Sequence, residues 1–120
     1  MKTVMPQRIF QIAYDLGLLR VREVALAEQG FSVNSALGNT DARRVLAEDA
    51  PYDAFLIGWS ATSSERKSIV SWLKQRWPAI TVIALHDPYQ EPTPGADVAA
   101  TYDTPEGWIG AVKTALQRKQ

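Results

Sequence analysis

The chain has 120 residues, of which 46% are hydrophobic and 22% charged, and these values are typical of one globular domain and argue against a disordered or fibrous chain. Its 13 basic and 13 acidic residues give a net charge of +0, whereas a nucleic-acid binder usually carries a basic surplus. There is no cysteine, which excludes disulfides, thiolate metal sites and cysteine nucleophiles.

No apolar run of the sequence approaches the roughly 20 residues that a membrane-spanning helix needs. The N-terminus also lacks the apolar stretch of a signal peptide. We therefore expect one cytoplasmic domain over residues 1–120, with no membrane and no nucleic-acid partner. Whether this sequence is a whole protein or a piece of a larger one stays open.

The first predicted unit is a strand followed by a helix. Residues 8–14 are rich in isoleucine and aromatic side chains, which is typical of a strand. Four apolar residues then follow at helical spacing: Leu18, Val21, Val24 and Ala25. They predict an amphipathic helix with these side chains on its apolar face, and Gly30 is a typical residue for the end of that helix.

The second predicted unit is shorter. Residues 31–33 form a brief strand candidate. Asn39 and Thr40 are candidate caps for a helix that runs through Leu46, because their side-chain oxygens can accept hydrogen bonds from the free N–H groups of the first turn. Pro51 should end this region, since proline cannot continue a helix.

The third predicted strand, residues 54–57, is a continuous apolar run, the pattern of a strand that is buried on both faces. Thr62 and Glu65 follow with the spacing of a capping box, so a helix should begin there. This helix should end at Trp77, because the residue before a proline is disfavoured in helical conformation.

The last part of the chain predicts two more strands and a helix. Residues 80–85 are β-branched and apolar, and residues 98–102 form a weaker strand candidate. Three of the eight residues between His86 and Gly95 are proline, and each interior proline would cost a helix roughly 3 kcal/mol. Residues 104–106, Thr-Pro-Glu, are a strong helix start.

Strands that alternate with helices predict an α/β fold with a five-stranded parallel sheet and helices on both faces. In such folds, ligands bind at the carboxyl ends of the strands. The residues that follow the predicted strands at this edge are Asp15, Gly58, Trp59, Ser60, His86, Asp87, Tyr102 and Asp103. These side chains are therefore the first candidates for a functional site.

Five short segments, in this order and at this spacing, resemble response-regulator receiver domains. The segments are residues 29–33, 51–57, 81–85, 95–97 and 104–106. The resemblance implies a single flavodoxin-like domain with strand order 2-1-3-4-5. It also implies a role in two-component signal transduction, where receivers are phosphorylated on an aspartate.

At the positions where receivers carry their functional residues, this sequence has residues of a different chemical kind. The acidic pair falls on Ala13 and Tyr14, the phosphoacceptor aspartate on Gly58, the hydroxyl residue on His86 and the lysine on Tyr102. Glycine has no side chain to carry a phosphoryl group. Asp15, the residue after the acidic positions, is a poor substitute for a carboxylate cluster that holds Mg²⁺. We therefore expect a pseudo-receiver that is not phosphorylated, with no metal, no cofactor and no enzymatic activity.

The prolines before Gly95 fall where receivers have their fourth helix, so we expect that helix to be shortened or absent. This helix contributes to the surface through which most receivers dimerise. Its loss puts family-style dimerisation in doubt, although a homodimer remains possible. It should also expose neighbouring apolar surface.

Four residues after the third strand are a candidate interaction or anion site: Trp59, Ser60, Ser63 and Ser64. Trp59 either forms a recognition surface, as tryptophans at binding hot spots do, or fills the volume of the missing acidic pocket. The serines lie at a helix N-terminus, which can bind an anion, but a helix cap with a polar loop is the more ordinary interpretation.

Other polar groups are expected to be structural. His86 and Asp87 could approach Asp15 and hold a metal or act as a base, but exposed or capping roles are the ordinary explanation. We expect the adjacent pairs 43–44 and 66–67, which are Arg-Arg and Arg-Lys, to be solvated helix surface.

The sequence thus favours a non-phosphorylatable signalling domain that binds a protein partner, such as a kinase, another regulator or a second copy. The alternative is a small-molecule or anion binder, or a minor enzyme, that uses the carboxyl edge of the sheet. A deep pocket lined by Asp15, Ser60, His86 and Tyr102 would favour the alternative. A filled edge, with apolar surface exposed elsewhere, would favour the interaction module.

Overall fold

The computed structural model describes residues 6–47 and 52–117. Pro51, which we expected to end the second helical region, lies outside the described residues. None of the helices within the described ranges is long and apolar enough to cross a membrane.

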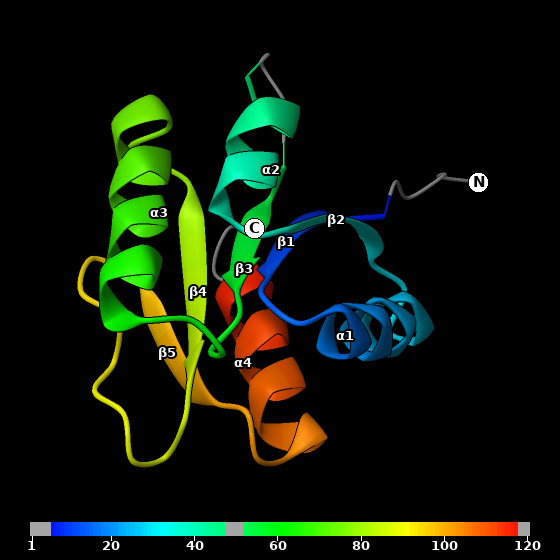
Figure 1. The fold of residues 1–120 in the computed structure, drawn as a ribbon. Helices are drawn as coiled ribbons and strands as arrows, with labels where there is room; N and C mark the ends of the chain where they lie inside the picture. Colours follow the sequence, from blue (N-terminus) through cyan, green and yellow to red (C-terminus); the bar gives the residue numbers. More distant parts are fainter. Residues whose placement is uncertain (1–5, 48–51, 118–120) are drawn as a thin grey trace.

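Five parallel strands form one sheet at the centre of the molecule (Figure 1). They are β1 (Arg8–Ala13), β2 (Ser32–Leu37), β3 (Ala54–Ile57), β4 (Thr81–His86) and β5 (Val98–Thr101). Their order in the sheet is β2-β1-β3-β4-β5, and every neighbouring pair is parallel. The predicted strand order is therefore confirmed, and all five strands end at the same edge.

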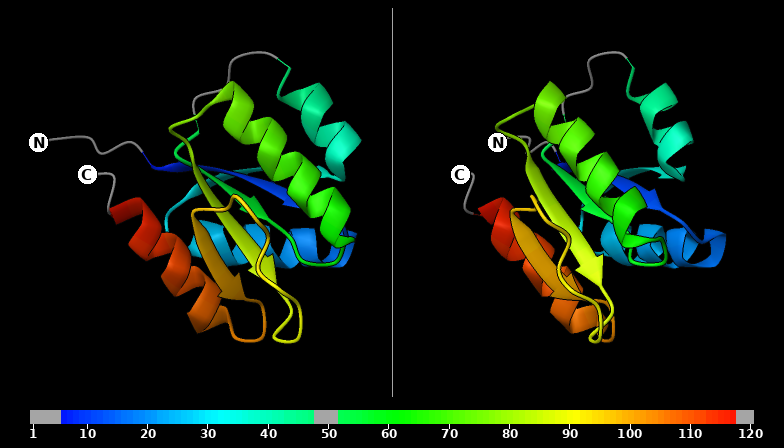
Figure 2. Two further views of the ribbon diagram at one scale, coloured as in Figure 1. Left: turned by 90° about the vertical axis from the view of Figure 1, so that its left-hand side faces the viewer. Right: turned by 60° about the vertical axis from the view of Figure 1, so that its left-hand side comes forward.

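The described residues form four helices, two on each face of the sheet (Figure 2). They are α1 (Leu16–Glu28), α2 (Asn39–Val45), α3 (Ser63–Arg76) and α4 (Pro105–Gln117). One apolar cluster joins α2 and α3 to the sheet, and a second joins α1 and α4 to the opposite face. This is the three-layer arrangement that βαβ crossovers produce.

Strand β3 explains why the core is continuous through the sheet. Its four residues are all buried, with Phe55 and Ile57 in the cluster on the α2/α3 side, and Ala54 and Leu56 in the other. Successive side chains of a strand point to opposite faces. An uninterrupted apolar run is therefore required at the centre of a sheet that is covered on both faces.

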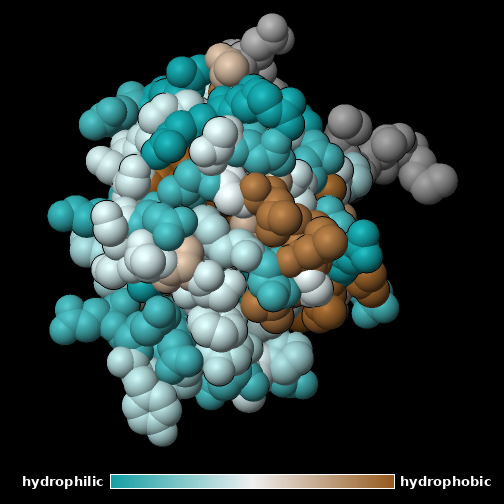
Figure 3. All heavy atoms as spheres, in the orientation of Figure 1, coloured by the Kyte–Doolittle hydropathy of each residue, from teal (hydrophilic) through white to brown (hydrophobic). Residues whose placement is uncertain are grey.

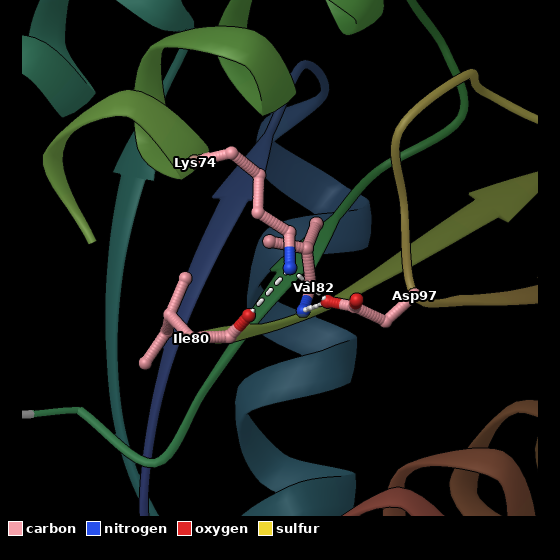
Figure 4. A network of polar contacts seen from close by, with 4 residues as sticks. All are labelled: Lys74, Ile80, Val82 and Asp97. Atoms are coloured by element: carbon pink, nitrogen blue, oxygen red, sulfur yellow. Dashed lines mark hydrogen bonds and ion pairs between the residues drawn. The ribbon is translucent and has the colours of Figure 1, made fainter. Parts of the chain in front are cut away.

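The connection from β4 to β5 contains no helix; residues 87–97 form turns and bends. Asp97 fixes the end of this loop (Figure 4): its carboxylate accepts hydrogen bonds from the Val82 N–H at 2.8 Å and from Lys74 Nζ at 2.6 Å. Lys74 Nζ also donates to the Ile80 carbonyl at 2.7 Å. The loop is thereby tied to α3 and to the beginning of β4.

Helix α1 buries only part of the apolar set at helical spacing: Ala25 packs against the core, but the two valines do not. Val21 and Val24 are 64% and 59% exposed, whereas Leu19, Arg22 and Leu26 are buried. The spacing of 19, 22 and 26 is as helical as that of the predicted apolar residues. The sheet selects it because polar Gln11 of β1 faces α1 and contacts Arg22. Apolar periodicity alone therefore placed the two valines on the wrong side of this helix.

Two further expectations are wrong in detail. Strand β2 extends to Leu37, well beyond the predicted residues 31–33, because pairing with β1 along its whole length recruits the polar residues of this edge strand. Helix α2 begins after Gly38, which has a φ of 86° and forms no side-chain cap. Asn39 is the first helical residue, so neither it nor Thr40 caps the helix.

The orientation of α1 predicts different costs for two neighbouring substitutions. Leu26→Ala should lower the free energy of unfolding by about 2–5 kcal/mol, because it removes a fully buried side chain from the core. Val24→Ala should change it by less than about 0.5 kcal/mol, because Val24 is exposed. Urea denaturation measures both. A larger loss for Val24→Ala would restore the helix face predicted from the sequence.

Candidate functional site

The structure brings the sequence-predicted site residues to one edge of the sheet. Ala13 ends β1, Gly58 follows β3, His86 ends β4 and Tyr102 follows β5. Because all strands are parallel, these positions are neighbours at the carboxyl edge. Side chains from other elements pack against several of these positions.

Gly58 lies against a buried arginine. A Cβ atom built on Gly58 would lie 3.0 Å from Arg22 Nη1 and 3.4 Å from the Ile12 carbonyl oxygen. Carbon and nitrogen atoms without a bond rarely approach this closely, so a side chain here would require the end of the Arg22 side chain to shift by a few tenths of an ångström. The guanidinium group of α1 thus occupies the space beside the end of β3.

Arg22 is 4% exposed, and its Nη1 donates a hydrogen bond to Oε1 of another buried side chain, Gln11, at 3.3 Å. Gln11 Nε2 in turn donates to the Leu19 carbonyl and to Ser35 Oγ. Burial lowers the pKa of Arg22 to about 10, an effect that the nearby Asp15 carboxylate opposes. This network was not predicted from the sequence, although a glutamine inside an apolar strand is a signal for it.

Tyr14 links three elements at the edge. Its hydroxyl donates to Asn39 Oδ1 at 2.6 Å, and Asn39 Nδ2 donates to the Glu65 carbonyl at 2.8 Å. Tyr14, which follows β1, is therefore linked through Asn39 of α2 to the first turn of α3. Burial and the nearby Glu65 raise the pKa of Tyr14 well above its ordinary value of 10.0.

Asp15, the acidic residue nearest the family's acidic positions, caps α1. Its Oδ1 accepts a hydrogen bond from the Leu18 N–H at 2.9 Å. This is a standard N-cap contact, which satisfies a free backbone donor of the first turn. The capping role that we expected as the ordinary explanation is therefore present.

Trp59 and Tyr102 stack on each other at the opposite part of the edge. Their ring centroids are 4.3 Å apart with an interplanar angle of 18°. Trp59 is half-buried and packs against the apolar cluster of α1 and α4. Of the two interpretations of Trp59, the contacts favour the one in which it fills volume, because its ring is covered by Tyr102.

Arg66 is a second buried arginine, and the expectation that it is solvated surface is wrong. It is 2% exposed. Its Nε donates to the Ala61 carbonyl at 3.2 Å, and its Nη1 donates to the hydroxyl of buried Thr93 at 2.8 Å. The side chain spans from the start of α3 to the β4–β5 loop, a contact between distant segments that helical periodicity cannot reveal.

His86 and Asp87 take local structural roles. His86 is half-buried, and its Nδ1 lies 2.9 Å from the Asp87 carbonyl oxygen. The Asp87 carboxylate accepts from the Tyr89 N–H at 2.9 Å, and its own N–H donates to Gln90. Within the described ranges, no group of three or more His, Cys, Asp or Glu residues could hold a metal ion.

The hydroxyl cluster after β3 does not form a closed site. Thr62 is the N-cap of α3 and accepts from the Glu65 N–H at 3.1 Å, as the capping-box spacing predicted. Ser60, Ser63 and Ser64 are exposed. Ser64 lines two open hollows, one of about 450 Å³ with Arg43 and Lys67 and one of about 580 Å³ with Leu37 and Asn39. Another, of about 380 Å³, lies beside Pro94 and Gly95.

Comparisons with known proteins place this geometry in a fold family. No protein-family model matches the chain, and no curated protein matches its sequence. Solved structures do. A CheY-like response regulator receiver domain protein from Methanospirillum hungatei JF-1 has a TM-score of 0.82 at 16% identity, covering 96% of this chain and 97% of that one. The chain has the receiver-domain fold.

Two more structures with this fold are similar over nearly their whole length. The receiver domain of an HD domain-containing protein from Pseudomonas fluorescens Pf-5 has a TM-score of 0.80 at 15% identity, covering 96% of this chain and 98% of that one. The Thermotoga maritima response regulator TrrA, in complex with the histidine kinase ThkA, has a TM-score of 0.79 at 14% identity, covering 92% and 98%. At these identities the likeness establishes the fold.

The bond between Arg66 and Thr93 predicts coupling between α3 and the β4–β5 loop. Thr93→Val keeps the shape of the side chain but leaves a buried arginine donor without its acceptor, so it should lower the free energy of unfolding by about 1–3 kcal/mol. Amide hydrogen exchange in residues 87–97 should become faster. Lys67→Ala, at the exposed position next to Arg66, is the control and should have little effect.

The raised pKa of Tyr14 predicts a pH dependence. The unfolded chain releases the Tyr14 proton near pH 10, whereas the folded chain retains it. This contribution to stability is therefore complete below pH 10 and is lost as the pH rises above it. In Tyr14→Phe, the free energy of unfolding should fall less steeply above pH 10 than in the wild type. Parallel curves from denaturant titrations would contradict the assignment.

Proposed function

We propose that this chain is a cytoplasmic signalling domain with a receiver fold that works without phosphorylation at the end of β3, by binding a partner protein. The observation that carries this proposal is Arg22 Nη1, 3.0 Å from the position of a Cβ on Gly58. A receiver's acceptor aspartate would need that space. Here it holds a positive group that belongs to the core of the domain.

The surroundings of Gly58 support the same conclusion. Phosphoryl transfer to a carboxylate depends on a metal ion and positive groups that stabilise the transferred phosphoryl oxygens. Mg²⁺ prefers carboxylate and water oxygens in octahedral geometry. Ala13 offers no such ligand, the Tyr14 hydroxyl is bonded to Asn39, and the Asp15 carboxylate caps α1. The side chains at this edge hold the fold together, and residues 6–47 and 52–117 contain no group of three or more His, Cys, Asp or Glu residues that could hold a cation.

The partner class is proposed from the fold. The similar structure of TrrA contains a histidine kinase bound to a response regulator, and both are signalling proteins. We propose that this chain likewise acts through a protein surface, as a module without enzymatic activity. The absence of cysteine fits a reducing cytoplasm.

The four residues predicted to line a small-molecule pocket do not form one. The site that would favour the small-molecule alternative required Asp15, Ser60, His86 and Tyr102 to line a deep pocket. Instead, Tyr102 is stacked on Trp59, Asp15 is engaged in a cap and Ser60 is exposed. The open hollow of about 580 Å³ at this edge is lined by other residues, Leu37, Asn39 and Ser64 among them.

Exposure to acetyl phosphate and Mg²⁺ tests the proposal. Intact-mass spectrometry should show no gain of a phosphoryl group in the wild type. Gly58→Asp should also show none, because restoring the nucleophile supplies neither the metal ligands nor the missing lysine. A canonical receiver, treated in parallel, confirms that the phosphodonor is active.

Two outcomes would overturn the proposal. A phosphoryl adduct on the wild-type chain would place an acceptor at another residue and make the domain phosphorylatable. An adduct on Gly58→Asp at a rate like that of the control receiver would mean that the metal site is intact, and that only the nucleophile has been lost.

A further inference from the structure

The outward face of α1 is apolar. Val21 and Val24 are 64% and 59% exposed, and Leu16 at the start of the helix is 48% exposed. Leu37, at the end of the neighbouring β2, is 45% exposed. Figure 3 shows hydrophobic surface gathered over α1 and the end of β2, on the right of the molecule. Exposed large apolar side chains that gather in one region mark interaction sites more often than single ones do.

The charges on this face have a defined arrangement. Arg20 and Glu28 are both exposed and stand four residues before and four residues after Val24. Residues four apart lie on one side of a helix, and eight residues span about 12 Å at 1.5 Å per residue. Among the described residues, neither Arg20 nor Glu28 takes part in an ion pair. The face therefore has an apolar centre with a positive end and a negative end.

This pattern is complementary to itself. When two copies of α1 pack antiparallel across a two-fold axis at Val24, Arg20 of one copy lies opposite Glu28 of the other, and the reverse pair forms at the other end. Val24 meets its equivalent, and Val21 meets Ala27. An isologous interface requires this property, because residue i contacts j while j contacts i.

We propose that the α1 face is a homodimer interface, in which two copies of the chain pack α1 against α1 in antiparallel orientation with Val24 at the axis. The apolar residues Val21 and Val24 supply the buried area, and the two Arg20–Glu28 pairs fix the orientation and register. Opposite charges across an interface contribute more to specificity than to affinity. The pairing uses a surface far from the β4–β5 loop, where this chain has no helix.

The size of the face sets the strength of the dimer. Helix α1 has 13 residues and is therefore about 20 Å long. One pair of such helices buries less than the roughly 1,600 Å² of a standard stable interface. The dimer should accordingly be weak, and its population should rise with concentration. The proposal rests on the α1 face alone, so it can fail while the proposal of a phosphorylation-independent domain stands.

Sedimentation velocity over a series of protein concentrations tests the interface. The wild-type chain should shift from monomer toward dimer as the concentration rises. Val24→Asp should remove the shift, because it places two like charges at the axis. The control Val45→Asp changes an equally apolar exposed residue on α2 and should dimerise like the wild type. Circular dichroism verifies that both variants are folded.

A charge exchange tests the orientation. Arg20→Glu and Glu28→Arg should each weaken dimerisation at least several-fold, because each places like charges opposite one another. The double variant should regain wild-type dimerisation, since both pairs are restored in reverse. A chain that stays monomeric at every concentration would overturn the proposal and leave the face to a different protein. A dimer that persists in Val24→Asp, or a double variant no better than the single ones, would overturn it too.

Discussion

The contact between Arg22 and the end of β3 is the constraint on which the site depends. A buried guanidinium group is costly unless hydrogen bonds compensate for the water it has lost, and Gln11 in the middle of β1 supplies such a bond. The arginine then occupies the volume beside Gly58, where glycine is the residue that leaves it undisturbed. By the resemblance to receivers, this is the position of the aspartate that is phosphorylated. Here the position is part of the packing between α1 and the sheet.

The other changes at the edge have the same character. Tyr14 is bonded through Asn39 to the start of α3, Arg66 holds the β4–β5 loop through Thr93, and Trp59 is covered by Tyr102. Each contact ties together segments that are distant in sequence. A switch requires two arrangements of similar free energy, whereas these bonds all favour one. These contacts stabilise the arrangement of the edge seen in this structure.

Much of the fold could be predicted because its signals are local. The apolar run of β3 and the capping box at Thr62 and Glu65 depend on residues close together in the chain, and both were correct. The errors arose where a local pattern had two solutions. The apolar residues of α1 and the set 19, 22 and 26 share one helical period, and the choice between them depended on Gln11, a residue of another element. Arg66 was misplaced because its partner, Thr93, is 27 residues away.

By itself, the sequence determined the alternation of strands and helices, and with it the parallel sheet and the edge at which its strands end. Through the resemblance to receivers, it also predicts that Gly58 and Tyr102 stand at the positions of the family's aspartate and lysine. Only the tertiary structure decided what fills that edge and which face of α1 remains outside. The physical reason is that periodicity and caps are properties of neighbouring residues. The burial of an arginine or the exposure of a valine is decided by packing between elements that meet only in the folded chain.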